Sequence, residues 1–119
     1  MKLQLFEDYK GLGDYGTPTF PLFVERTRVH DLAVDEEDDS FPHWLCCTIE
    51  GHEVFIPETF VADGALLRDY NPTELPAQKG EVVTLLEFVF EWAFVKNSAG
   101  KTGWIPSRYL VSAPRPSTI

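Results

Sequence analysis

Trp104-Ile105-Pro106-Ser107-Arg108-Tyr109-Leu110, near the end of this 119-residue chain, has the same pattern as an earlier segment, Phe55-Ile56-Pro57-Glu58-Thr59-Phe60-Val61. Both segments read aromatic-Ile-Pro-x-x-aromatic-aliphatic. A tryptophan precedes each proline at a similar distance, since Trp44 lies 13 residues before Pro57 and Trp92 lies 14 residues before Pro106. This matched spacing indicates that the chain holds a duplicated module of about 60 residues.

The beginning of the module repeats as well. Leu5-Phe6-Glu7-Asp8-Tyr9 corresponds to Leu66-Leu67-Arg68-Asp69-Tyr70. We therefore predict one module at residues 1–63, with a long first loop and an acidic loop, a second at residues 64–112, and a mobile tail at residues 113–119. Modules of this size bury too little surface to be very stable alone, and their junction is short, so we expect them to pack together.

Short runs of β-branched and aromatic residues, separated by turn residues, surround both copies of the repeat. Strands are predicted at residues 28–34, 44–49, 53–57, 80–87, 92–96 and 101–106. No segment has helical periodicity. The pattern predicts an all-β fold made of two consecutive small β-barrels packed across a short junction. Strand alternation places Ala93 and Val95 in the core if Trp92 faces outward.

The net charge of −9 is unevenly distributed along the chain. Residues 1–64 carry four Lys/Arg against fourteen Asp/Glu, a net of −10, whereas residues 65–119 carry six against five, a net of +1. A half with a charge of −10 is repelled by a phosphate backbone, so nucleic acid is not expected as a partner. No apolar run approaches the roughly 20 residues that span a bilayer, so no membrane partner is expected either.

The only cysteines, Cys46 and Cys47, are adjacent. A strand places neighbouring side chains on opposite faces, so with Trp44 outward we expect Leu45 and Cys47 inward and Cys46 as the more accessible thiol. No second Cys or His pair has ligand spacing, so we expect reduced thiols and neither a metal nor a cofactor. Without an N-terminal signal core the chain is expected to be cytoplasmic, unless a leader has been removed.

No catalytic arrangement is evident from the sequence. His30, His43 and His52 each lie near an acid, but no Ser or Cys nucleophile motif accompanies them. A histidine in a surface loop is the ordinary interpretation of each, and we expect that the protein is not an enzyme.

In their order along the chain, the motifs of residues 66–111 resemble the Src-homology-3 (SH3) family. They are the opening Leu66–Tyr70, the segment Lys79-Gly80-Glu81, Trp92, and Gly103–Tyr109. Residues 5–61 resemble the family more weakly, and the arrangement is similar to bacterial proteins with tandem domains of this type. Two features depart from the family pattern: Arg68 and Arg108 replace a Tyr and an Asn, and the loop from Tyr70 to Gly80 is short.

The resemblance implies shallow grooves for a left-handed polyproline helix, with an acidic loop that takes an Arg or Lys of the ligand. In the second repeat the implied groove consists of Tyr70, Trp92, Pro106 and Tyr109, with Glu74 and Glu91 as acids. In the first repeat it consists of Tyr9, Trp44, Pro57 and Phe60, with the acidic run Asp35, Glu36, Glu37, Asp38 and Asp39 beside Trp44.

The predicted function is a non-enzymatic module that binds a protein or peptide, Pro-rich or basic, through these Tyr/Trp/Pro surfaces. Because clustered carboxylates attract cations, the first repeat is expected to favour a basic partner. Three alternatives stay open. In the first, the acidic run is only a solvated loop. In the second, the protein has a structural role and its aromatic surfaces are buried between the repeats or in a homodimer. In the third, the protein recognises cell-wall peptides.

Overall fold

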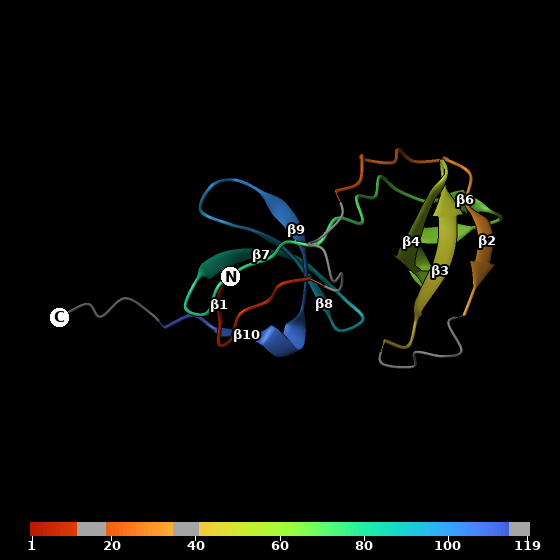
Figure 1. The fold of residues 1–119 in the computed structure, drawn as a ribbon. Helices are drawn as coiled ribbons and strands as arrows, with labels where there is room; N and C mark the ends of the chain where they lie inside the picture. Colours follow the sequence, from red (N-terminus) through yellow and green to blue (C-terminus); the bar gives the residue numbers. More distant parts are fainter. Residues whose placement is uncertain (12–18, 35–40, 115–119) are drawn as a thin grey trace. The chain divides into compact units, whose positions relative to one another are not determined.

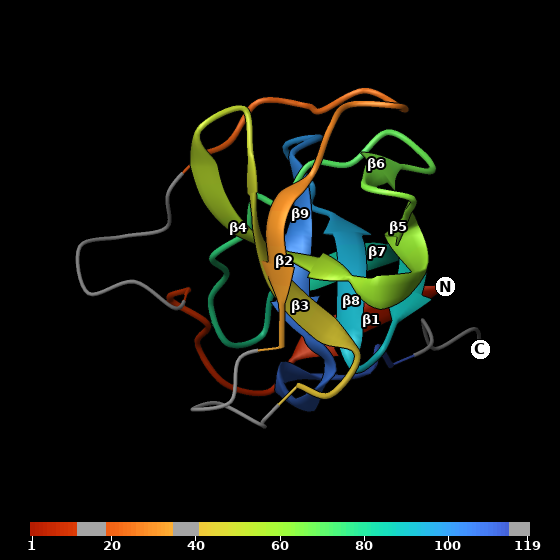
Figure 2. The ribbon, with the colours of Figure 1, turned by 90° about the vertical axis from the view of Figure 1, so that its right-hand side faces the viewer.

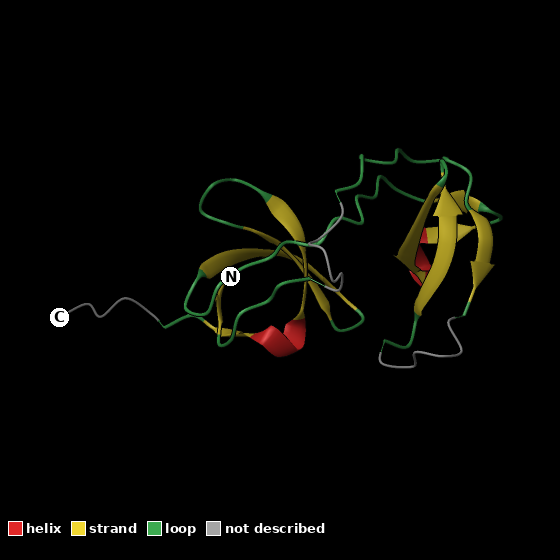
Figure 3. Cartoon of the chain, in the orientation of Figure 1, coloured by secondary structure: helices red, strands yellow, loops and turns green. Residues whose placement is uncertain are grey.

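The computed structural model describes residues 1–11, 19–34 and 41–114. Within them the fold is all-β, as the sequence predicts, with two single-turn 3₁₀ helices (Figure 3). The strands are β1 (Lys2–Leu5), β2 (His30–Ala33), β3 (Trp44–Ile49), β4 (His52–Pro57), β5 (Val61–Ala62), β6 (Ala65–Leu66), β7 (Val82–Val89), β8 (Trp92–Lys96), β9 (Thr102–Pro106) and β10 (Leu110–Ser112); the 3₁₀ helices are η1 (Glu58–Phe60) and η2 (Ser107–Tyr109). No helix in these residues is long and apolar enough to cross a membrane.

The chain divides into two compact units. One, here called the discontinuous unit, consists of residues 1–18 and 74–119, and the other, the continuous unit, consists of residues 19–73. Figure 1 shows β1 among β7–β10, and β6 with β2–β4. This division differs from the predicted modules at residues 1–63 and 64–112, because the opening segment of each half pairs with strands of the other half.

The discontinuous unit is built on a five-stranded antiparallel sheet in the order β10-β1-β7-β8-β9. Leu5, Val83, Val95 and Ile105 are at most 1% exposed and form the centre of its core. Ala93 is equally buried, so the predicted inward positions of Ala93 and Val95 are confirmed. The β-branched residues of these strands fill this core and leave polar side chains such as Lys96 outside.

The continuous unit combines the sheet β2-β3-β4 with the short pair β5-β6, which Figure 2 shows from a second direction. Its core contains Phe23, Ile49, Ile56 and Leu66, each at most 2% exposed. Among the strands that the structure describes, pairing leaves the sheets open, so the structure supports the all-β class without closed barrels.

The two units repeat several contacts. Trp44 is the cross-strand partner of Pro57, and Trp92 is the partner of Pro106. At the start of each 3₁₀ helix a backbone N–H donates to a carbonyl that precedes the tryptophan, Glu58 to His43 and Ser107 to Glu91, both at 2.8 Å. These matched hydrogen bonds give the sequence repeat a structural basis.

The two opening segments occupy equivalent places in different units. In the discontinuous unit, Tyr9 exchanges two backbone hydrogen bonds with Ala77, at 2.8 and 2.9 Å. In the continuous unit, Tyr70 exchanges two with Phe23, at 2.9 and 2.8 Å. The opening segment 5–9 is thus paired with the second half of the chain, and the opening segment 66–70 with the first half.

The two thiols differ in accessibility as the sequence predicts. Cys47 is 5% exposed, and Cys46 is half-buried with its thiol donating to the carbonyl of Ala33 at 3.2 Å. Leu45, which was expected on the inner face, is only half-buried. Burial, and to a smaller extent the neighbouring Cys46, raises the pKa of the Cys47 thiol to about 11.

Raising the pH is therefore expected to destabilise the protein through Cys47. Because the folded-state pKa is raised above the unfolded value, the stabilisation is complete below about pH 8.5 and is lost as the pH rises to about 11, by roughly 2–3 kcal/mol. The free energy of unfolding, measured by urea denaturation across this range, should decrease less steeply in Cys47→Ala. Cys46→Ala, which retains the Cys47 thiol, is the control. Equal slopes in the wild type and Cys47→Ala would contradict the assignment.

Candidate functional site

An aromatic cluster in the discontinuous unit brings together Tyr9, Trp92 and Tyr109. The Tyr9 ring lies edge-on to Trp92 at 6.5 Å between centroids and is tilted against Tyr109 at 4.9 Å. Pro106 ends β9 opposite Trp92, and the following η2 carries Tyr109 back toward Tyr9. Edge-on and tilted pairs of this kind are favourable arrangements for aromatic rings, so the cluster has a defined shape.

The Tyr9 hydroxyl donates a hydrogen bond to the Glu74 carboxylate. Burial raises the pKa of Tyr9 well above its ordinary value, and the adjacent Glu74 raises it further. Tyr9 therefore stays protonated and keeps its role as a donor. Glu74, predicted as an acid that meets the ligand, is instead engaged with Tyr9, while Glu91 is exposed at the turn between β7 and β8.

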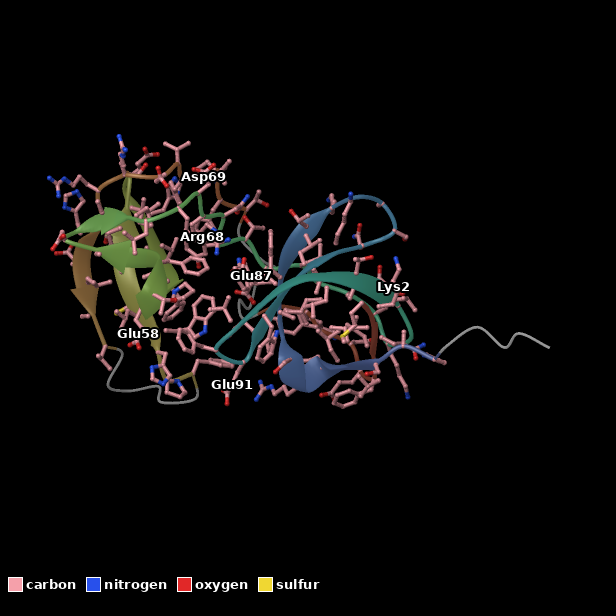
Figure 4. All side chains as sticks on the ribbon, turned by 180° about the vertical axis from the view of Figure 1, so that it is seen from behind. Lys2, Glu58, Arg68, Asp69, Glu87 and Glu91 are labelled. Carbon is pink, nitrogen blue, oxygen red and sulfur yellow. The ribbon has the colours of Figure 1, made fainter. Side chains whose placement is uncertain are left out.

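A second aromatic cluster, in the continuous unit, contains Phe60 and Tyr70. Their rings meet edge-on at 5.5 Å, and the Tyr70 hydroxyl donates to the carbonyl of Phe55 at 2.6 Å. The Arg68 guanidinium lies 4.2 Å from the centre of the Phe60 ring, a distance typical of cation–π contacts. Figure 4 shows Arg68 and Glu58, whose carboxylate lies 2.8 Å from Nδ1 of His43.

The predicted groove residues are therefore assembled in a different combination. Tyr9, and not Tyr70, contacts Trp92 and Tyr109, and Tyr70 joins Phe60. The predicted sets Tyr70/Trp92/Pro106/Tyr109 and Tyr9/Trp44/Pro57/Phe60 each need this correction. The physical reason is that each opening segment packs against strands of the other half of the chain, 5–9 in the discontinuous unit and 66–70 in the continuous unit. The short loop after Tyr70 is the sequence feature that points to such an exchange.

The tryptophans do not lie on an open surface as expected. Trp92 is 6% exposed and Trp44 is 9% exposed, and Pro57 and Pro106 are fully buried. Tyr109 is half-buried. Glu7 and Arg108 are exposed, and in the sequence they lie next to the residues of this cluster, Glu7 near Tyr9 and Arg108 directly before Tyr109. The accessible part of this site is thus the edge formed by Tyr109 and its charged neighbours.

The net negative charge of the chain lies in the continuous unit. Residues 19–73 carry three Lys/Arg against twelve Asp/Glu, a net of −9, whereas residues 1–18 and 74–119 carry seven against seven, a net of zero. The acidic run Asp35–Asp39, predicted to stand beside Trp44, lies outside the described residues. In the part that the structure describes, no group of three His, Cys, Asp or Glu side chains is placed to hold a metal ion.

An all-β fold with clustered Tyr, Trp and Pro side chains is typical of small protein-interaction domains. Residues 68–107 match the model of the SH3 domain family, whose members are typically non-catalytic modules that bind peptides, commonly proline-rich ones. The matched segment begins in the continuous unit and ends in the discontinuous unit. No curated protein and no solved structure is significantly similar to the chain.

Proposed function

We propose that this chain is a non-enzymatic interaction module with two SH3-like units, which binds extended peptides at its aromatic clusters. The observation that carries the proposal is the cluster of Tyr9, Trp92 and Tyr109 around Pro106 in the discontinuous unit. Grooves lined by clustered aromatic rings fit a polyproline helix, which loses little entropy on binding because it is already stiff. Tyr109 and the exposed Glu91 supply the accessible contacts.

The continuous unit is proposed to prefer a cationic partner. Its net charge of −9 attracts Lys and Arg over distances comparable to the Debye length of about 8 Å at physiological salt. His43 directly precedes Trp44, and the exposed Glu58, which contacts His43, follows Pro57, the cross-strand partner of Trp44. Arg68 over Phe60 adds one cation at this cluster. A basic peptide that also carries an acidic residue, close to the residues that contact the aromatic rings, is therefore expected to bind most tightly.

Titration with proline-rich peptides tests this function. A Lys/Arg-bearing peptide is expected to shift the NMR signals of the Trp92 and Trp44 indoles. Tyr109→Ala should weaken the response of Trp92 by about tenfold, as truncation of an aromatic contact residue typically does. A peptide with Gln in place of Lys and Arg, and added salt, should reduce the response of Trp44.

Unchanged signals at both indoles would reject peptide binding at these clusters. An equal response to the charged and the Gln-substituted peptide would reject the preference for a basic partner. Tyr109→Phe, which retains the ring, is the matched control for Tyr109→Ala.

A second candidate function is a structural role, in which the aromatic positions stabilise the protein or a homodimer. The burial of Trp44 and Trp92 favours it. In this case peptides should leave the indole signals of both the wild-type and the Tyr109→Ala proteins unchanged, and sedimentation should show a concentration-dependent dimer. A monomer with both indoles open to solute quenching would count against it.

A further inference from the structure

The two opening segments dock through the same set of backbone hydrogen bonds. In the discontinuous unit Gly80 donates to Leu5 at 2.8 Å, and in the continuous unit Arg26 donates to Leu66 at 2.9 Å. Gly80 and Arg26 both have a positive φ, of 88° and 75°. Leu5 and Leu66 are 1% and 2% exposed. Each docking groove therefore offers the same backbone shape and the same pocket for a leucine.

A carboxylate anchors each opening segment in the same way. Asp8 accepts a hydrogen bond from the backbone N–H of Lys79 at 2.7 Å, and Asp69 accepts one from that of Glu25 at 2.8 Å. Leu, Asp and Tyr have the same spacing in both opening segments, so the contacts that hold one are available to the other. Nothing in these contacts selects the partner of an opening segment.

The link between Tyr70 and Ala77 is the feature that distinguishes the two possible pairings. Its residues, Asn71-Pro72-Thr73-Glu74-Leu75-Pro76, contain no backbone turn in the structure. Thr73 is held to Phe20 of the continuous unit, whose N–H donates to the Thr73 hydroxyl at 2.9 Å. Leu75 is held in the discontinuous unit, where its N–H donates to the carbonyl of Trp104 at 3.1 Å.

The opposite pairing would require this link to fold back on itself. Tyr70 would then lie antiparallel to Ala77, as Tyr9 does now, and the chain would have to reverse direction within residues 71–76. Pro72 and Pro76 have fixed φ angles and push the residues before them toward extended backbone, which opposes such a turn. Short connections that resist turning favour exchange of segments between domains.

We propose that the pairing of the opening segments is a switch between two states. In the exchanged state, which the structure shows, each opening segment pairs with the other half of the chain, and in the unexchanged state each pairs with its own half. The proline-containing link 71–76 holds the chain in the exchanged state. The switch decides which charged side chain belongs to which cluster. In the exchanged state Arg68 covers Phe60, and Glu7 is the corresponding residue of the cluster of Tyr109. In the unexchanged state Arg68 and Glu7 trade places. Their effect on ligand choice rests on the proposed function.

Engineered disulfides distinguish the two states without any ligand. In a Cys46→Ser, Cys47→Ala background, Gln4→Cys with Val82→Cys reports the exchanged state, because residues 4 and 82 are cross-strand partners. Ala65 holds the corresponding place against Arg28, so Ala65→Cys with Val82→Cys reports the unexchanged state. The first pair is expected to close readily in a glutathione buffer, and the second pair slowly.

Lengthening the link tests its role. Insertion of Gly-Ser-Gly-Ser between Pro72 and Thr73, combined with Pro72→Ala and Pro76→Ala, should speed closure of the second pair by about tenfold, because the turn becomes accessible. The same insertion between Ser98 and Ala99, within one hairpin of the discontinuous unit, is the control and should change neither pair.

Closure of the second pair but not the first in the unmodified link would overturn the exchanged assignment. Unchanged closure of both pairs after insertion would overturn the switch, and so would crosslinking mainly between copies of the chain. Peptide binding is measured separately through the indoles, so its failure would reject the proposed function and leave the disulfide result in place.

Discussion

Leu5→Ala is expected to destabilise strands of the second half of the chain, by about 2–5 kcal/mol, as removal of a fully buried leucine side chain typically does. Leu5 is 1% exposed and ends β1, which pairs with β7 and β10, in a core made largely of residues after position 80. Native-state hydrogen exchange should show loss of protection at the amides of β8 and β9. Those of β3 and β4, nearer in sequence, should change less.

The reciprocal variant provides the matched test. Leu66→Ala should lower protection in β3 and β4, because β6 pairs with β5 and its backbone bonds to Thr27 of the continuous unit. Phe6→Ala, which truncates an exposed neighbour of Leu5, is the control and should cost about 0.5 kcal/mol or less. Loss of protection in β3 and β4 upon Leu5→Ala, with β8 and β9 unaffected, would show that the opening segments are not exchanged.

Gly103→Ala is expected to destabilise the discontinuous unit by about 1–3 kcal/mol through overpacking. A Cβ at this position would meet Cβ of Leu75 at 2.7 Å and the Leu75 backbone nitrogen at 2.9 Å, closer than atoms can approach. The Glu74–Leu75 backbone lies directly against β9 here, bonded to Trp104, so it cannot move without losing that bond. Thermal and urea denaturation measure the loss.

Thr102→Ala is the control for Gly103→Ala, since Thr102 precedes it in β9 with an exposed side chain. It should change the free energy of unfolding by no more than about 0.5 kcal/mol. A Gly103→Ala variant as stable as wild type would mean that the Glu74–Leu75 backbone does not lie against β9.

Much of the fold follows from short-range patterns. The spacing from tryptophan to Ile-Pro predicted the repeat, and the structure pairs Trp44 with Pro57 and Trp92 with Pro106. Alternation predicted the burial of Val95 and Cys47. These predictions succeed because side chains alternate at a fixed period along a strand, so the identity of nearby residues determines which face is buried.

The aromatic clusters were predicted less well. The residue types were right, but Tyr9 and Tyr70 were assigned to the wrong clusters, and the tryptophans were expected to be exposed. Both points depend on contacts between residues far apart in the chain. Two segments with the same Leu, Asp and Tyr spacing fit either groove, so their own residues do not determine which groove each one occupies, and the short link after Tyr70 is the sequence feature that bears on it.

The sequence by itself determined the duplicated motif, the all-β class and the inward faces of the central strands, because these depend on spacing and alternation within a few residues. Only the tertiary structure decided that Leu5 and Tyr9 pack with β7–β9 while Leu66 and Tyr70 pack in the continuous unit. That choice depends on whether the link 71–76 turns back or runs on between Thr73 and Leu75. Two prolines and the hydrogen bonds at its two ends favour the extended path.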